Sequence, residues 1–189
     1  MQFAKDSFFL ALQTRLAGLN PARTVTIDGT TVPAVLVVEN LPPVAVEPQP
    51  NVFYIEWGRA GVADGHAGNS ALMGMECIIS YYTLGTVQSM VDRGRVLGQL
   101  DGELLGICQP TKTEKVDYTQ SPAADLGTKV FWSQPAFNEA FAAGVEDDTS
   151  NYQTARAARK VFYAQAFQDG RAARRAELTV FFFSEVTLL

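Results

Sequence analysis

The sequence is poor in the residues that enzymes and metalloproteins use most. Its 189 residues include one histidine, His66, and two cysteines, Cys77 and Cys108. A Ser–His–Asp triad needs a histidine held in a fixed orientation, and His66 lies in a glycine-rich stretch that predicts a loop. Zinc sites need three or four nitrogen or sulfur ligands, which one histidine and two separated cysteines cannot supply. We therefore expect no catalytic residue, no metal and no cofactor.

Motifs for nucleotide binding, redox chemistry and calcium binding are missing as well. The glycines after residue 57 form neither G-x-G-x-x-G nor G-x-x-x-x-G-K-[ST], and the cysteines form no C-x-x-C pair. We expect both cysteines to be buried free thiols, which is the usual state of unpaired cysteine. Glu139, Asp147 and Asp148 lack the spacing of a calcium loop and are expected to be solvated.

Long apolar runs and an excess of basic charge are also absent. No stretch approaches 18 consecutive apolar residues, and the N-terminus lacks the pattern of a signal peptide. We therefore expect no membrane association, and folding in a cytosol. Lys and Arg total 15 against 20 for Asp and Glu, which gives a net charge of −5. Such a chain is a poor candidate for wrapping nucleic acid, because phosphate binding needs a basic surface.

Helical periodicity is present in two segments. Residues 6–19 predict a helix with Asp6 or Ser7 as its N-cap. Its apolar stripe consists of Phe8, Phe9, Leu12, Leu16 and Leu19. Residues 86–108 predict a second helix, in which glycine recurs at positions 94, 98, 102 and 106. Each glycine costs a helix about 0.5–1 kcal/mol. The repeat therefore indicates either close approach of a sheet or a neighbouring chain, or a weakly specified helix.

Strand patterns fill most of the rest of the chain. Asp28-Gly29 between two β-forming runs predicts a hairpin. Further strands are predicted at residues 34–38, 52–57, 71–83, 129–133 and 176–186, with loops at 58–70 and 111–128 and a short helical turn at 138–144. Residues 156–167 combine helical and strand signals, and Asp169-Gly170 predicts a turn.

This element order predicts an α+β fold, a mainly antiparallel sheet with two helices packed on one face. We expect residues 1–189 to form a single domain, with a hairpin elaboration at residues 138–175. Phe181 and Phe183 then lie on the face turned away from the helices and need a cover. Two alternatives remain for what covers them: another copy of the chain, or residues 156–167 of the same chain.

Basic residues concentrate in one region only, around the predicted turn. They are Arg156, Arg159, Lys160, Arg171, Arg174 and Arg175. Three interpretations remain: a solvated hairpin surface, a contact with an acidic partner, or a contact with DNA.

The order of elements carries a resemblance. The helix of residues 6–17 runs into Asn-Pro-Ala-Arg at 20–23, and a hairpin, a short apolar strand and Phe-Tyr-Ile-Glu-Trp at 53–57 follow. Then come the long strand, a helix through residues 90–95, Phe-Trp-Ser at 131–133 and a final strand at 176–183. This arrangement resembles the tail terminators, and related neck or minor tail proteins, of long-tailed bacteriophages.

The resemblance implies a structural virion protein whose copies form a homohexameric ring that caps the tail tube and joins tail to head. It implies tail tube and neck or connector proteins as partners, DNA only passing through the lumen, and assembly in the host cytoplasm. A negative charge suits a lumen through which DNA slides. Subunit or partner contacts are expected at Trp57, Arg93, Arg95, Trp132, Arg174, Arg175, Phe181 and Phe183. A head-completion or neck adaptor protein and a small-molecule-binding module are the alternatives.

Overall fold

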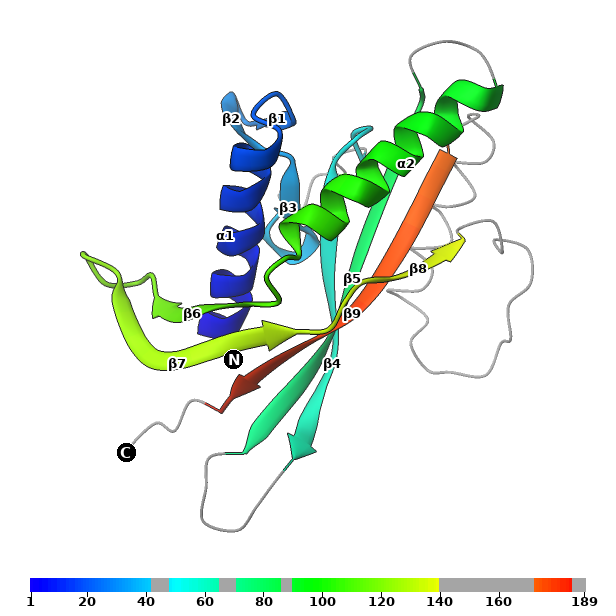
Figure 1. Ribbon diagram of the computed structural model, residues 1–189. Coiled ribbons are helices and arrows are strands. Elements are labelled where there is room, and N and C mark those ends of the chain that lie inside the picture. The colour runs from blue at the N-terminus through cyan, green and yellow to red at the C-terminus, as the bar shows by residue number, and fades with distance from the viewer. Residues whose placement is uncertain (42–47, 65–70, 86–89, 140–171, 185–189) are drawn as a thin grey trace.

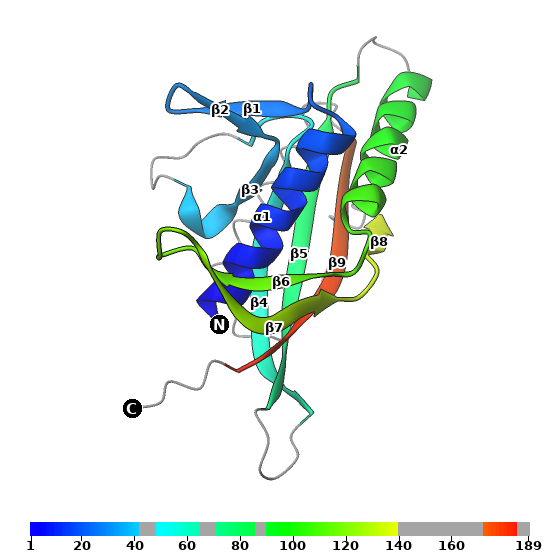
Figure 2. The same ribbon diagram turned by 60° about the vertical axis from the view of Figure 1, so that its left-hand side comes forward.

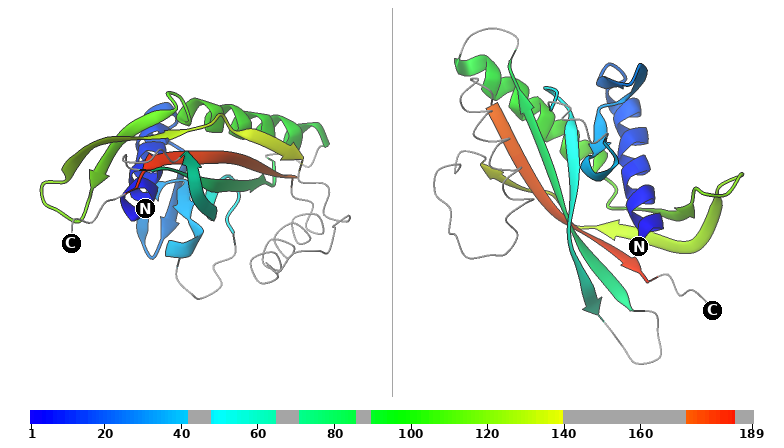
Figure 3. Two further views of the ribbon diagram at one scale, coloured as in Figure 1. Left: turned by 90° about the horizontal axis from the view of Figure 1, so that it is seen from below. Right: turned by 180° about the vertical axis from the view of Figure 1, so that it is seen from behind.

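Two helices and a strongly curled sheet make up the computed structural model, which describes residues 1–41, 48–64, 71–85, 90–139 and 172–184 (Figure 1). The sheet is mostly antiparallel. Both helices lie on the same side of it (Figures 2 and 3). The predicted α+β class and the one-sided helix layer are therefore confirmed.

The first helix, α1 (Gln2–Leu19), begins earlier than its sequence predicts. Ser7 is no N-cap, since it lies inside the helix and is 1% exposed. Its hydroxyl donates to the Phe3 carbonyl at 2.7 Å and accepts from the Val116 amide at 2.9 Å. The predicted stripe is buried at Phe8, Leu12 and Leu16, whereas Leu19 at the end of the helix is 54% exposed.

A small two-stranded hairpin follows α1. Strands β1 (Thr24–Ile27) and β2 (Thr30–Pro33) pair antiparallel, as predicted. Asp28 and Gly29 between them have φ values of 47° and 78°. Two successive positive φ angles give a turn whose twist matches that of the flanking strands.

The main sheet has seven strands, with the order β3-β4-β5-β9-β7-β6 and β8 paired to β9. Their bounds are β3 Val35–Val37, β4 Phe53–Asp64, β5 Leu72–Thr83, β6 Lys112–Asp117, β7 Ala124–Trp132, β8 Ala136–Glu139 and β9 Ala172–Phe183. A 3-10 turn (Val38–Asn40) follows β3. Only β3 and β4 pair in parallel. Strand β9 comes last in the sequence and lies between β5 on one side and β7 and β8 on the other.

Three predictions of irregular structure are wrong in the described residues. Strand β4 continues through residues 58–64, which were expected to be a loop. Strand β6 and the first half of β7 occupy most of residues 111–128, also expected to be a loop. Residues 138–139 belong to β8 and are not helical. Each segment is rich in glycine or polar residues and gains its strand geometry from pairing, β4 with β5 and β6 with β7 in hairpins and β8 with the distant β9.

Some predictions fall on residues outside the described part of the chain. These concern His66, Asp147, Asp148, residues 156–167 and the Asp169-Gly170 turn. Strand β8 does pair antiparallel with residues 174–177 of β9. The hairpin elaboration between these two strands stays a prediction.

The second helix, α2 (Met90–Ile107), carries the four regularly spaced glycines. A Cβ atom added at Gly94, Gly98 or Gly102 would meet no atom within 4 Å. One at Gly106 would lie 3.0 Å from Cδ2 of Leu19. Close approach of the sheet therefore explains none of the four glycines, because the contact at Gly106 is with the end of an exposed side chain of α1. Contact with a neighbouring chain stays a prediction. None of the described helices is long and apolar enough to cross a lipid bilayer.

The core lies between the helices and the concave side of the sheet. Phe8 is at its centre, with its ring edge-to-face against Trp132 at 5.0 Å and Trp57 at 5.7 Å between ring centroids. The Trp132 indole N–H donates to the Cys108 carbonyl at 2.8 Å, which joins β7 to the end of α2. Helix α1 therefore packs through Phe8 against both β4 and β7.

Candidate subunit interface

The side chains of β9 alternate between the two faces of the sheet, and the two faces differ in burial. Ala176, Leu178, Val180 and Phe182 are buried beneath the helices. Phe181 and Phe183 point to the opposite side, here called the outer face, as the alternation of a strand requires. Phe183 is 38% exposed. The prediction that these two phenylalanines face away from the helices is confirmed.

Phe131 of β7 joins them. It pairs with Phe181 across the strands and is also 38% exposed. We call Phe131, Phe181 and Phe183 the aromatic patch. Beside it, a Cβ atom at Gly74 of β5 would lie 3.5 Å from the Phe181 ring and 3.4 Å from the Ala63 side chain of β4. Apolar groups thus form one row across four strands of the outer face.

One end of the outer face, around Tyr54 and Tyr82, is covered by Pro48 and Gln49 of the same chain. The Tyr82 hydroxyl donates to the Pro48 carbonyl, and the Gln49 amide donates to the Tyr54 hydroxyl at 2.6 Å. Tyr54 and Tyr82 are 5% and 2% exposed. The residues before β4 therefore shield this end of the face, whereas Phe131 and Phe183 of the aromatic patch at the other end are exposed.

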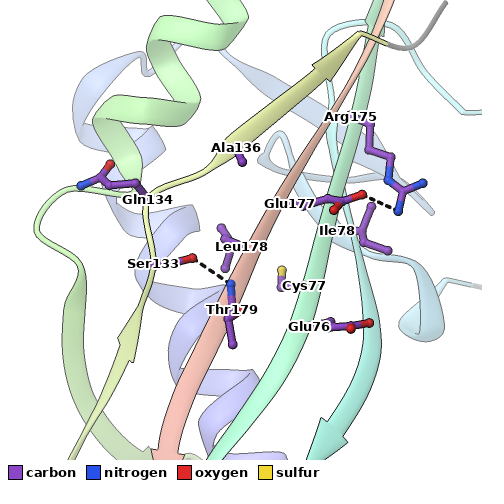
Figure 4. A pocket seen from close by; sticks show the side chains of 10 residues that line it. All are labelled: Glu76, Cys77, Ile78, Ser133, Gln134, Ala136, Arg175, Glu177, Leu178 and Thr179. Atoms are coloured by element: carbon purple, nitrogen blue, oxygen red, sulfur yellow. Dashed lines mark hydrogen bonds and ion pairs between the residues drawn. The ribbon is translucent and has the colours of Figure 1, made fainter. Parts of the chain in front are cut away.

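A shallow hollow of about 480 Å³ opens on the outer face where β7 passes into β8 (Figure 4). Its walls come from β5, β9 and the β7–β8 connection: Glu76, Cys77, Ile78, Ser133, Gln134, Ala136, Arg175, Glu177, Leu178 and Thr179. The Thr179 amide donates to the Ser133 hydroxyl at 3.0 Å, so this hydroxyl is held by the backbone of β9.

Charged side chains of both signs line the hollow. Arg175 Nη2 lies 2.6 Å from Glu177 Oε1, and both side chains remain partly exposed. The buried Nε of Arg175 has no hydrogen-bond partner among the described residues. Glu76 leans over Gly58, where an added Cβ would lie 2.7 Å from its Oε2. The added Cβ would also lie 2.8 Å from the Cβ of Glu76, so a side chain at position 58 would force this part of β5 to shift.

The predicted contact residues are distributed over both faces of the sheet. Arg175, Phe181 and Phe183 share the outer face of β9, where Arg175 pairs with Ser80 of β5 and Phe181 pairs farther along with Gly74. Arg93 and Arg95 lie on α2, on the opposite side of the sheet. Trp132 is only 3% exposed and belongs to the core, so it is wrong as a contact residue.

Trp57 and Arg174 are engaged inside the chain. The Trp57 ring packs on Phe8 beneath the Lys5 ammonium, which lies 5.4 Å from the ring centroid. Arg174 Nη2 donates to Asp101 Oδ2 of α2 at 3.0 Å, and the Tyr81 hydroxyl donates to Oδ1 of the same carboxylate. Burial, reinforced by the Asp101 charge, raises the pKa of Tyr81. This cluster fastens α2 to β5 and β9.

Phe131 is the contact candidate that the sequence prediction missed. The signal was present, because Lys-Val-Phe-Trp-Ser alternates along a strand. Val130 and Trp132 are buried on the helix side, and this places Phe131 on the other face.

The residues that the structure describes bear on metal binding and on thiol reactivity. Within them, no three His, Cys, Asp or Glu side chains gather as metal ligands. Both cysteines are buried free thiols, as predicted. Burial raises the pKa of Cys77 well above its usual value and that of Cys108 to about 12. A thiol held protonated in this way is a poor nucleophile and a poor metal ligand.

We expect neither thiol to react with Ellman's reagent at pH 8 in the native protein, and both to react after denaturation. Thiols of the unfolded chain titrate near pH 9.0, while the folded thiols keep their protons to higher pH. The free energy of unfolding should therefore fall as the pH rises above about 9. Urea titrations between pH 7 and pH 10 measure this, and rapid labelling of either native thiol would contradict the buried placement.

The arrangement is that of a binding surface, with an aromatic patch beside a hollow lined by charged groups. The models of known protein families contain no match to this chain, and no curated protein sequence matches it.

Proposed function

We propose that this chain is a structural virion protein, a bacteriophage tail terminator whose copies assemble into a ring that caps the tail tube and joins tail to head. The single observation that carries the proposal is the aromatic patch. Phe131 and Phe183, on adjacent strands, are each 38% exposed beside the half-buried Phe181, and exposed apolar clusters of this kind mark sites of association. The resemblance in element order supplies the identity of the assembly, and the net charge of −5 suits a lumen that DNA crosses.

The patch provides a direct test. In native mass spectrometry and negative-stain imaging, we expect the wild-type chain to form rings of six subunits, alone or on isolated tail tubes. Changing Phe131 and Phe183 together to serine should raise the concentration needed for half-assembly about 10- to 100-fold, because buried aromatic residues dominate contact energies. Changing Leu105, which is 40% exposed on α2, to serine is the matched control.

Circular dichroism and thermal unfolding show whether each variant keeps its fold. A folded double variant that assembles like the wild type would remove the patch as the support for this proposal. Rings that form only on the head-side connector would instead identify a neck adaptor.

The hollow favours a small-molecule-binding module as a second candidate, because charged and hydroxyl groups converge in it. Thermal-shift screening against metabolites tests this directly. A rise of several degrees in the melting temperature, lost when Arg175 is changed to methionine, would support binding in the hollow.

A further inference from the structure

The hollow and the aromatic patch lie next to each other on the outer face. Ser133 and Thr179 line the hollow, and each is two residues along its strand from a phenylalanine of the patch, Phe131 or Phe181. Alternate residues of a strand point to the same face and lie about 7 Å apart. One continuous surface therefore carries an exposed aromatic ring, that of Phe131, beside a depression.

The hollow has room for an aromatic side chain. Its volume is about 480 Å³, whereas a cavity of about 150 Å³ is enough to hold benzene. Part of its wall is apolar, and the residues that form this part are Cys77, Ile78, Ala136 and Leu178 (Figure 4). Ala136 is exposed, so the wall that β8 contributes can be reached from solvent.

The hollow carries an excess of negative charge. Two carboxylates, of Glu76 and Glu177, and one guanidinium, of Arg175, line it. Arg175 and Glu177 form an ion pair, which leaves the Glu76 carboxylate. This carboxylate is exposed, and among the described residues it accepts only the Arg59 backbone amide, at 3.4 Å.

The aromatic patch has an ammonium group beside it. Lys112 of β6 pairs with Phe131 across the strands, so the two side chains share the outer face. Lys112 is exposed and has no ion-pair partner in the part of the chain that the structure describes. In the next pair on this face, Lys129 and Glu114 neutralise each other at 3.0 Å. The surroundings of the patch therefore carry an excess of positive charge.

The two unmatched charges do not meet within one chain. Lys112 lies on β6 and Glu76 on β5, and strands β7 and β9 lie between them. Three strand spacings amount to roughly 14 Å, which is too far for an ion pair. A second copy of the chain supplies a partner for each charge. Complementary charges of this kind guide association and fix its register.

We propose that the hollow of one copy receives the Phe131 ring of a second copy, with Lys112 of the second copy facing Glu76 of the first. The inference rests on the proposed function, since it takes the aromatic patch as the site of association, and it names the surface that the patch contacts. A copy that gives its ring to one neighbour and receives a ring from another makes a heterologous contact. Such contacts generate rings when the rotation closes.

Two complementary variants test the contact. Changing Phe131 to serine removes the ring, and changing Ala136 to tryptophan fills the hollow. Each variant alone should raise the concentration needed for half-assembly about tenfold or more. Changing Ala136 to serine is the matched control and should assemble like the wild type. Both positions are exposed, so all three variants should keep the wild-type melting temperature within a few degrees.

Mixing the two variants locates the contact. The tryptophan variant keeps its Phe131 ring, and the serine variant at position 131 keeps an open hollow. In native mass spectrometry with one variant isotopically labelled, we therefore expect one-to-one pairs at concentrations at which each variant alone is monomeric. Neither pair member can extend the assembly, so the mixture should form no rings.

Charge reversal provides a second test, which stays decisive if the tryptophan variant does not fold. Changing Lys112 to glutamate or Glu76 to lysine should each raise the concentration for half-assembly about fivefold, the scale of an exposed ion pair. Both changes in one chain should restore most of the loss, because the two charges are exchanged together. Changing Arg95, exposed on α2, to glutamate is the control and should leave assembly unchanged.

The outcomes separate the two proposals. If the wild type forms rings while the mixed variants stay monomeric or the double charge reversal restores nothing, the contact is wrong and the proposed function stands. If the wild type forms only pairs, and both single variants lose them, the contact stands and the ring is wrong. If the chain stays monomeric at every concentration and on tail tubes, both proposals fail.

Discussion

Changing Phe8 to alanine should lower the free energy of unfolding by about 3–5 kcal/mol, the range for truncating a buried phenylalanine. Phe8 has no exposed surface and contacts Trp57 and Trp132 edge-to-face. Such aromatic pairs contribute about 0.5–1.5 kcal/mol beyond the area they bury. Urea unfolding followed by tryptophan fluorescence measures the loss, because both tryptophans of the chain contact this ring.

Two variants control this experiment. Changing Phe8 to leucine keeps most of the volume and should cost clearly less than the alanine variant, and it remains measurable if the alanine variant does not fold. Changing the exposed Leu19 to alanine should alter the stability by no more than about 0.5 kcal/mol. A loss below about 1 kcal/mol for Phe8→Ala would mean that α1 does not anchor the core.

Changing Arg15 to alanine should destabilise the fold by about 2–3 kcal/mol, since hydrogen bonds from charged groups are among the stronger ones. Its guanidinium donates to the carbonyls of Ile107, Pro110 and Lys112 at 3.0, 2.7 and 2.8 Å. It also lies 5.1 Å from the centre of the Trp132 ring. One side chain of α1 therefore holds the chain where α2 ends and β6 begins.

Lysine at position 15 should restore less than half of this loss, because an ammonium group cannot reach three carbonyls in one plane. Hydrogen exchange at residues 107–113 should accelerate in the alanine variant more than elsewhere. Alanine at Arg95, an exposed arginine of α2, is the control and should be neutral within about 0.5 kcal/mol. Equal effects at positions 15 and 95 would contradict the anchoring role.

Short sequence patterns predicted several elements of the fold. The Asp28-Gly29 hairpin is a property of a short segment and is confirmed. The α1 stripe is confirmed at Phe8, Leu12 and Leu16 but not at Leu19. The half-buried alternation predicted for β5 holds only at residues 75–77, because Ile78, Ser80 and Tyr82 are buried as well. Strand β6 was missed because Lys-Thr-Glu-Lys-Val-Asp reads as polar loop. Its Lys115 is nevertheless 2% exposed and donates to the Phe183 carbonyl, a contact that only the assembled sheet provides.

The candidate interface was harder to predict from the sequence, because it too depends on how distant strands are arranged in the sheet. Whether an aromatic side chain lies in the core or on the surface depends on which sheet face it joins. Trp132 and Phe131 are neighbours in the chain, yet the first packs on Phe8 and the second faces solvent. Choosing between them needs the strand order, and that order depends on β9, which follows every other described strand in the sequence.

The central position of β9 also bears on how the protein is synthesised. Strands β5 and β7 meet the same strand, β9, and its residues leave the ribosome after all the other described elements. Contacts between such distant segments form slowly, and incomplete sheets expose apolar surface during translation. The nascent chain must therefore remain incompletely folded until β9 has emerged, and in that interval its unpaired strands are exposed to chaperones and to other nascent copies.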